Sequence, residues 1–149
     1  MKRNKMRLFR LGKYLFLLLL IAWAMPLVCQ ADPLSRALQN WEPMGIYGRI
    51  MEMGADGSSL VINEKTVLLV NQKRFLKVYR TKILDLEGKE LPLNVLSKGK
   101  YVAVKGAQSY EDKTNNPVVV AKEIYLLPKR MSRNELKQVD IFRTNPTKW

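Results

Sequence analysis

The chain has 149 residues, of which 26 are basic and 13 acidic, and it contains one cysteine and no histidine. Without histidine it lacks the commonest general base and the commonest metal ligand, so catalysis would need a carboxylate pair or a serine with a lysine. The excess of basic residues favours an anionic partner or a membrane surface.

The first 31 residues have the organisation of a secretory signal peptide. Six basic residues precede a largely apolar run of 15 residues, Tyr14 to Val28, and a small residue follows at Ala31. This order is typical of the leader of an exported protein, and the apolar run is shorter than the about 20 residues of a membrane-spanning helix. We therefore expect cleavage after Ala31 and export to the periplasm. Two alternatives stay open: a lipid attached to Cys29, and a leader retained as a membrane anchor.

Cleavage after Ala31 leaves 118 residues with no cysteine and with 20 basic against 13 acidic residues, a net charge of +7. A domain of this size buries roughly two thirds of the surface of its unfolded chain, so one core without disulfides suffices. We expect an N-terminal segment (32–43), a barrel domain (44–127) and a basic C-terminal tail (128–149).

The N-terminal segment carries apolar residues at helical spacing, which predicts a short helical turn over one end of the core. These residues are Leu34, Ala37, Leu38 and Trp41. From residue 45 onward, short runs rich in β-branched and aromatic residues alternate with glycine, asparagine and proline, which is typical of an all-β domain.

Residues 45–53 predict the first strand, with Ile46, Gly48 and Ile50 on one face. A turn at Asp56 and Gly57 follows. Residues 60–70 predict two short strands or one strand bent near residue 64. Residues 71–86 begin with basic residues and become strand-like from residue 78, and Gly88 then predicts a tight turn.

Leu93 and Leu96 predict a helical turn that Gly99 ends. The strand at 100–106 alternates, which directs Val102 and Val104 to the core. Lys105 shares the opposite face with Tyr101, and any ligand contact of this strand is expected there. Gly106 permits a bend or a bulge. A polar loop (107–117) leads to the hairpin partner, a strand at 118–127.

The C-terminal tail predicts a short helix. Ser132 and Glu135 have the spacing of a capping box, and Asn145 with Pro146 is expected to end the helix. Leu136, Val139 and Phe142 form a thin apolar stripe, and the tail carries a net charge of +4.

Four segments carry a resemblance to a known group: "GRIMEM" from Gly48, "LNVLSKG" ending at Gly99, "KYVAVKG" ending at Gly106 and "VVVAKEI" ending at Ile124. Over residues 44–127 the chain resembles the small exported bacterial barrels of the oligonucleotide- and oligosaccharide-binding (OB) type, the BOF-like domains, most of which have no known function. The resemblance implies a mainly β fold, a five- to six-stranded OB-like barrel with a short C-terminal helix. It implies no activity, because a fold does not determine a function.

The sequence does not contain the motifs of common active sites. Residues 98–108 lack the Gly, four residues and Gly-Lys-Ser/Thr of a phosphate-binding loop. Ser97 and Lys98 are adjacent, so their side chains point in opposite directions on an extended chain, and Glu111 with Asp112 fits a solvated loop tip. We expect no catalysis and no cofactor.

A metal-carrier function is the main alternative. Copper-carrying OB-like barrels use methionine thioethers and tryptophan, and Met51 with Met53 would lie on one face of a strand near Met44 and Trp41. These carriers also use a histidine, which this chain lacks, and methionine on a barrel strand ordinarily serves packing.

A basic segment is the predicted partner-binding surface, because OB barrels bind polyanions with basic and aromatic groups on one face. The alternative is a solvated edge whose lysines prevent strand pairing between copies. We expect a monomeric, exported accessory module of the cell envelope that binds an anionic polymer or another envelope protein, and export disfavours nucleic acid. The predicted binding residues are Lys73, Arg74, Lys77, Tyr79, Arg80 and Lys82.

Overall fold

The computed structural model describes residues 32–111, 114–139 and 148–149. The predicted leader, including Cys29 and the cleavage position at Ala31, lies outside these residues, as do Asp112, Phe142, Asn145 and Pro146. Residues 31–149 form one compact unit. No helix within the described residues has the length and apolar character needed to cross a bilayer.

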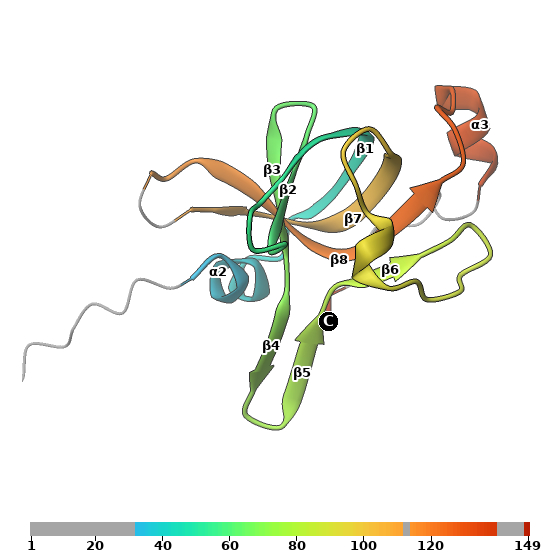
Figure 1. Ribbon diagram of the computed structural model, residues 1–149. Coiled ribbons are helices and arrows are strands. Elements are labelled where there is room, and N and C mark those ends of the chain that lie inside the picture. Colours follow the sequence, from blue (N-terminus) through green and yellow to red (C-terminus); the bar gives the residue numbers. More distant parts are fainter. Residues whose placement is uncertain (1–31, 112–113, 140–147) are drawn as a thin grey trace, which may run out of the picture. The chain divides into compact units, whose positions relative to one another are not determined.

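Five strands close into a barrel (Figure 1). Neighbours pair antiparallel in the order β3-β2-β1-β7-β8, and β8 then pairs parallel with β3, which closes the ring. A sixth strand, β6 (Lys82–Leu84), pairs parallel with β8 at Glu123–Tyr125, on the same edge as β3 and beyond it along the strand. This strand order is that of an OB barrel, so the predicted fold class is confirmed. The barrel strands are β1 (Pro43–Met53), β2 (Ser59–Ile62), β3 (Lys65–Leu69), β7 (Tyr101–Tyr110) and β8 (Pro117–Leu127).

The alternation of the strands fills the barrel. Ile46 and Ile50 of β1 point inward with Val102 and Val104 of β7, as the sequence predicts, and Ile124 of β8 completes this layer. Burying a side chain of this size contributes about 1.5–3 kcal/mol. A bulge between Lys105 and Gly106 shifts the register of β7 against β8, which confirms the predicted bulge.

A second apolar layer covers the outside of β7 and β8. Helix α2 (Pro33–Gln39) packs Leu34 and Ala37 against Ala107 and Val120. Asp32 caps this helix by accepting a hydrogen bond from the backbone N–H of Ser35 at 2.8 Å. The predicted N-terminal helical turn is therefore confirmed, and it covers the outer side of the barrel.

Helix α3 (Arg133–Gln138) covers a further part of the same two strands. Its Leu136 packs with Ala103, Tyr125 and Leu127. Ser132 and Glu135 form the predicted capping box. The helix is shorter than predicted, because it ends at Gln138 rather than at residue 145.

Three further predictions need correction. Of the loop predicted at 107–117, residues 107–110 belong to β7 and Pro117 to β8. Helix α2 covers the end of β7, where the Ser109 hydroxyl donates to the Pro33 carbonyl at 2.6 Å. Gly99 has a positive φ of 95° but lies beyond the 3₁₀ helix η1 (Leu93–Val95), which ends at Leu96. Residues 71–80, expected to become strand-like only from residue 78, form a complete hairpin.

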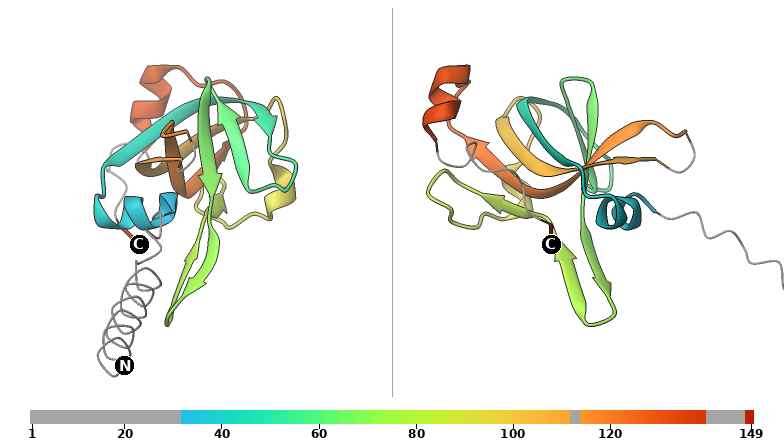
Figure 2. Two further views of the ribbon diagram at one scale, coloured as in Figure 1. Left: turned by 90° about the vertical axis from the view of Figure 1, so that its left-hand side faces the viewer. Right: turned by 180° about the vertical axis from the view of Figure 1, so that it is seen from behind.

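That hairpin consists of β4 (Asn71–Arg74) and β5 (Lys77–Arg80), joined by Phe75 and Leu76. It is a two-stranded sheet separate from the barrel sheet, and Figures 1 and 2 show it extending away from the barrel. The chain reaches it directly from β3 and leaves it directly into β6.

Candidate functional site

The hairpin carries five of the six predicted binding residues, but it divides them between two faces. Gln72 pairs with Tyr79 and Arg74 pairs with Lys77, so these four share one face. We name this the anchored face. The other face, named the open face, carries the remaining paired residues of the two strands. These residues are Asn71, Lys73, Val78 and Arg80.

The anchored face is tied to the start of α2. The Arg74 guanidinium forms an ion pair with the Asp32 carboxylate and donates a hydrogen bond to the Ser35 hydroxyl. Burial acts to raise the pKa of Asp32, but the hydrogen bonds from Ser35 and the charge of Arg74 outweigh it and lower that pKa. Arg74 therefore serves the attachment of the hairpin rather than a free binding surface.

An aromatic cluster supports the same face. The Trp149 ring packs edge-on against Tyr79 and Trp41, with centroids 6.0 and 5.6 Å away. Lys77 donates to the backbone oxygen of Trp149 at 2.7 Å, and its ammonium lies 5.5 Å from the centre of the Tyr79 ring. Tyr79 is thus a packing residue at the base of the hairpin.

The junction between hairpin and barrel is held by a buried hydroxyl. Thr81 accepts a hydrogen bond from the backbone N–H of Val70 at 2.7 Å and donates one to the Ala121 carbonyl at 2.6 Å. The Thr81 N–H also donates to the Val70 carbonyl at 2.8 Å. Both strands of the hairpin are therefore joined to β8 where they leave the barrel.

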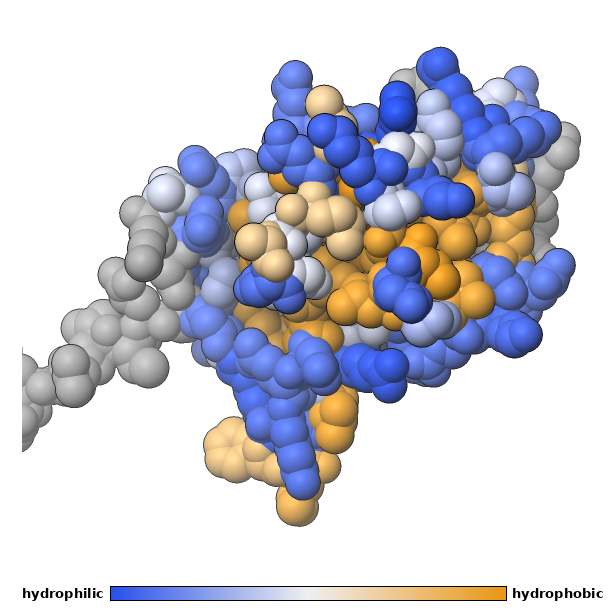
Figure 3. All heavy atoms as spheres, in the orientation of Figure 1, coloured by the Kyte–Doolittle hydropathy of each residue, from blue (hydrophilic) through white to orange (hydrophobic). Residues whose placement is uncertain are grey.

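The tip of the hairpin is apolar and open to solvent. Phe75 is 99% exposed, Leu76 101% and Val78 59%. Figure 3 shows the hydrophilic surface of the hairpin ending in apolar side chains. The predicted site includes none of these three residues, although two apolar residues at the centre of a basic segment are a signal that sequence reasoning can use.

The remaining predicted basic residues differ in their surroundings. Arg80 forms an exposed ion pair with Glu90 at 3.3 Å. Lys82 lies on β6, opposite Glu123 in the register of the β6–β8 strand pairing, and so is not part of the hairpin. Lys73 is exposed and forms no ion pair within the described part of the chain.

The strand face assigned to ligand contact by the sequence is covered at Lys105, whereas Tyr101 is half-buried and lines a surface pocket. Lys105 is only 7% exposed, and burial lowers its pKa while the neighbouring Glu123 carboxylate opposes that shift. Tyr125 donates its hydroxyl to Glu123 at 2.8 Å, and burial together with this carboxylate raises the pKa of Tyr125. The burial of Lys105 was not predicted, because sequence alternation cannot show that this part of β7 is packed beneath the second layer.

The methionines predicted as a copper site do not share a face. A register shift between Ile50 and Glu52 breaks the alternation of β1. Met51 is 47% exposed, whereas Met53 and Met44 pack against the core. Among the described residues, no group of three acidic, histidine or cysteine side chains is arranged to hold a metal ion.

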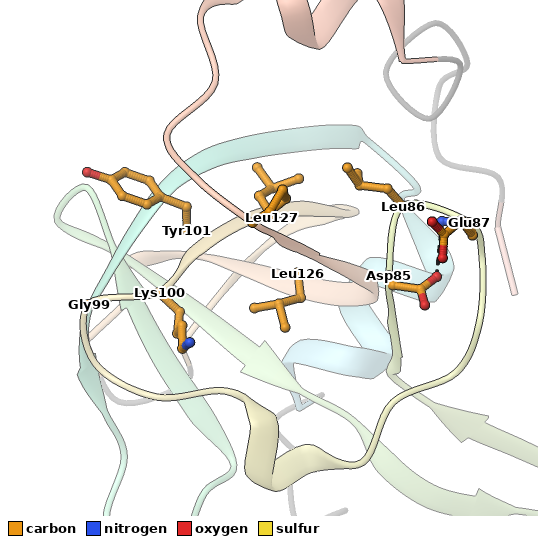
Figure 4. Close-up of a pocket in the computed structure, with 9 residues that line it drawn as sticks. Asp85, Leu86, Glu87, Gly99, Lys100, Tyr101, Leu126 and Leu127 are labelled. Carbon is orange, nitrogen blue, oxygen red and sulfur yellow. Dashed lines mark hydrogen bonds between the residues drawn. The ribbon is translucent and has the colours of Figure 1, made fainter.

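The surface also has a pocket of about 400 Å³ between the turn at Asp85 and the ends of β7 and β8. Figure 4 shows Leu126 and Leu127 on opposite sides of β8 beside it. The Asp85 carboxylate already accepts hydrogen bonds from the backbone N–H groups of Glu87 and Lys89, at 3.0 and 2.8 Å. The pocket thus combines apolar contact from its leucines with the charged groups of Asp85, Glu87 and Lys100.

Comparison with known proteins gives little further information. No protein-family model matches the chain, and no curated protein matches its sequence. A solved structure, the fimbrial biogenesis protein PilY2 from Pseudomonas aeruginosa, is similar to 68% of this chain and 98% of its own, with 13% identity and a TM-score of 0.38. The fold assignment accordingly rests on the strand pairing described above.

Proposed function

We propose that this protein is a non-catalytic binding module of the bacterial cell envelope, and that it contacts an anionic partner through the tip and the open face of the β4–β5 hairpin. The observation that carries the proposal is the exposed apolar tip on a supported, cationic hairpin. Exposed apolar residues that form a contiguous group commonly mark an interaction site. Envelope location is supported by the leader-like sequence of the first 31 residues.

The charge of the segment supports an anionic partner. Residues 65–84 contain six basic residues and no acidic one. Arg74 and Arg80 are paired with carboxylate side chains. The two remaining positive charges near the tip are Lys73 on the open face and Lys77, whose ammonium also donates to the Trp149 backbone oxygen. A solvated protective edge would also use lysines, but it would not combine them with an exposed Phe75 and Leu76.

The absence of catalysis is part of the proposal. It is supported by the composition, which has no histidine in the whole chain.

Retention of the unit Ala31–Trp149 on immobilised heparin tests the proposal. Retention should weaken as salt rises, and Lys73→Glu with Lys77→Glu should lower the eluting salt concentration. The matched control is Lys65→Glu with Lys98→Glu, which makes the same charge change at exposed positions outside the hairpin. An equal loss in both variants would show that net charge, rather than the hairpin, controls binding.

A further inference from the structure

The apolar surface of the described chain is concentrated at one place. Six large apolar side chains are exposed by 40% or more, and three of them lie between residues 75 and 78. The other three, Met51, Leu93 and Tyr110, lie on separate elements. The hairpin tip is thus the one place in this part of the chain where such residues adjoin.

The turn itself uses residues that a two-residue hairpin connection does not favour. Such connections prefer Asn-Gly or Asp-Gly, because the central residues adopt positive φ. Here Phe75 has a φ of 53°, which is uncommon for a bulky residue. Both the conformation and the full exposure are unfavourable for Phe75 in water, so the residue is explained better by a contact made outside this chain than by folding.

Two lysines flank this tip on opposite sides. Lys73 lies on the open face and Lys77 on the anchored face. A partner that meets the end of the hairpin therefore meets apolar groups at the centre and positive charge on both sides. That is the pattern of a membrane-surface element, in which apolar and aromatic residues enter the interface and cations contact anionic headgroups.

We propose that the anionic partner is the surface of a lipid bilayer with anionic headgroups, into which Phe75 and Leu76 insert while Lys73 and Lys77 contact the headgroups. This inference rests on the proposed function and names its partner. A narrow projecting tip enters a deformable interface without a preformed complementary cavity, whereas a protein would need a matching pocket.

Cosedimentation with vesicles tests this directly. The unit Ala31–Trp149 contains the three core clusters of the described residues. It should bind vesicles of equimolar phosphatidylcholine and phosphatidylglycerol, and it should not bind phosphatidylcholine alone. Phe75→Ser with Leu76→Ser should weaken binding about tenfold or more, because the apolar contribution is lost. Leu93→Ser is the matched control, since Leu93 is exposed on η1.

A fluorescent label gives an independent measure of insertion. The unit Ala31–Trp149 has no cysteine, so Phe75→Cys and Leu93→Cys each accept one environment-sensitive label. Anionic vesicles should shift the emission to the blue at position 75 and leave it unchanged at position 93. Unchanged thermal unfolding of each variant shows that it is folded.

Four outcomes distinguish the inference from the proposed function. Binding to anionic vesicles that requires the tip supports both. Binding that the tip variant leaves unchanged overturns insertion. Heparin retention that requires Lys73 and Lys77, without vesicle binding, overturns the bilayer inference and leaves an anionic polymer or acidic protein as the partner. If the parent protein neither stays on heparin nor binds anionic vesicles, both proposals are overturned.

Discussion

The β7–β8 and β4–β5 ribbons are both antiparallel pairs of neighbouring strands, yet they have opposite environments. In β7, six consecutive residues from Val102 to Ala107 are buried, because the barrel interior lies on one side and the second layer on the other. In β4 and β5 no residue is buried. The first ribbon is held by packing on both sides of its buried part, and the second is held through one face and at its junction with the barrel.

In the β4–β5 hairpin, the residues that stabilise the fold differ from the residues that are exposed. An isolated two-stranded ribbon is at best marginally stable in water, so β4–β5 depends on Thr81, on Arg74 and on the aromatic cluster of Trp149. Phe75 and Leu76 follow Arg74 directly at the turn, but both are fully exposed and so add nothing to these contacts. The proposed binding hairpin and the barrel core thus use the same local structure, a pair of antiparallel strands. They differ in how much of each pair is covered by other parts of the chain.

The largest effect should come from the core ribbon, at Gly106. A Cβ at this position would lie 2.1 Å from the Val120 carbonyl oxygen, closer than any non-bonded contact allows. Gly106→Ala should therefore lower the free energy of unfolding by about 3 kcal/mol or more, the upper end of overpacking effects. Urea denaturation of the unit Ala31–Trp149 measures this.

Gly45→Ala is the matched control for that substitution. Gly45 lies on the neighbouring strand β1, and its added Cβ would meet the Val104 carbonyl oxygen at 3.8 Å, an ordinary contact. Its free energy of unfolding should change by about 0.5 kcal/mol or less. Equal effects at the two glycines would contradict the close approach of β7 and β8 at the bulge.

Thr81 is the next test, because it joins the two regions. Thr81→Val removes both hydroxyl hydrogen bonds while keeping the shape of the side chain. The buried Val70 N–H and Ala121 carbonyl each lose a partner, so the unfolding free energy should fall by about 1–3 kcal/mol. Thr66→Val is the control: Thr66 lies on β3 and is only half-buried. Hydrogen exchange should also quicken in the hairpin more than in β7.

The sequence predicts the barrel strands far better than the β4–β5 hairpin. Alternation identifies β1 and the inward direction of Val102 and Val104, because one face of each strand lies in a single core. It cannot identify β4, since Asn71–Arg74 has no apolar residue and owes its conformation to tertiary contacts. The same limit explains Lys105, whose burial depends on residues distant in sequence.

Candidate binding residues follow the same rule. The charge of residues 65–84 is visible in the sequence, and so is the apolar pair at its centre. The division of the lysines and arginines between two faces depends on the position of the turn, and Phe-Leu lacks the Asn-Gly signal that predicts one. The ion pairs that occupy Arg74 and Arg80 involve Asp32 and Glu90, which no local pattern connects to them.

The smallest effect should be at the Asp32 to Arg74 ion pair, and it should depend on pH. Asparagine caps a helix as well as aspartate does, so Asp32→Asn removes the charge and keeps the cap. The two side chains are 41% and 26% exposed, and solvent screening limits the loss to about 0.2–1 kcal/mol at neutral pH. Because the folded-state pKa of Asp32 lies below its ordinary value of 3.8, the carboxylate stabilises the fold above that value. The difference between parent and variant should therefore be present at neutral pH and disappear as the pH falls through the folded-state pKa. Urea denaturation across this pH range measures it.

Arg74→Gln should lose the same pH-dependent part of the unfolding free energy. The two substitutions together should cost less than the sum of their separate effects. Full additivity would show that the ion pair does not hold the hairpin to α2.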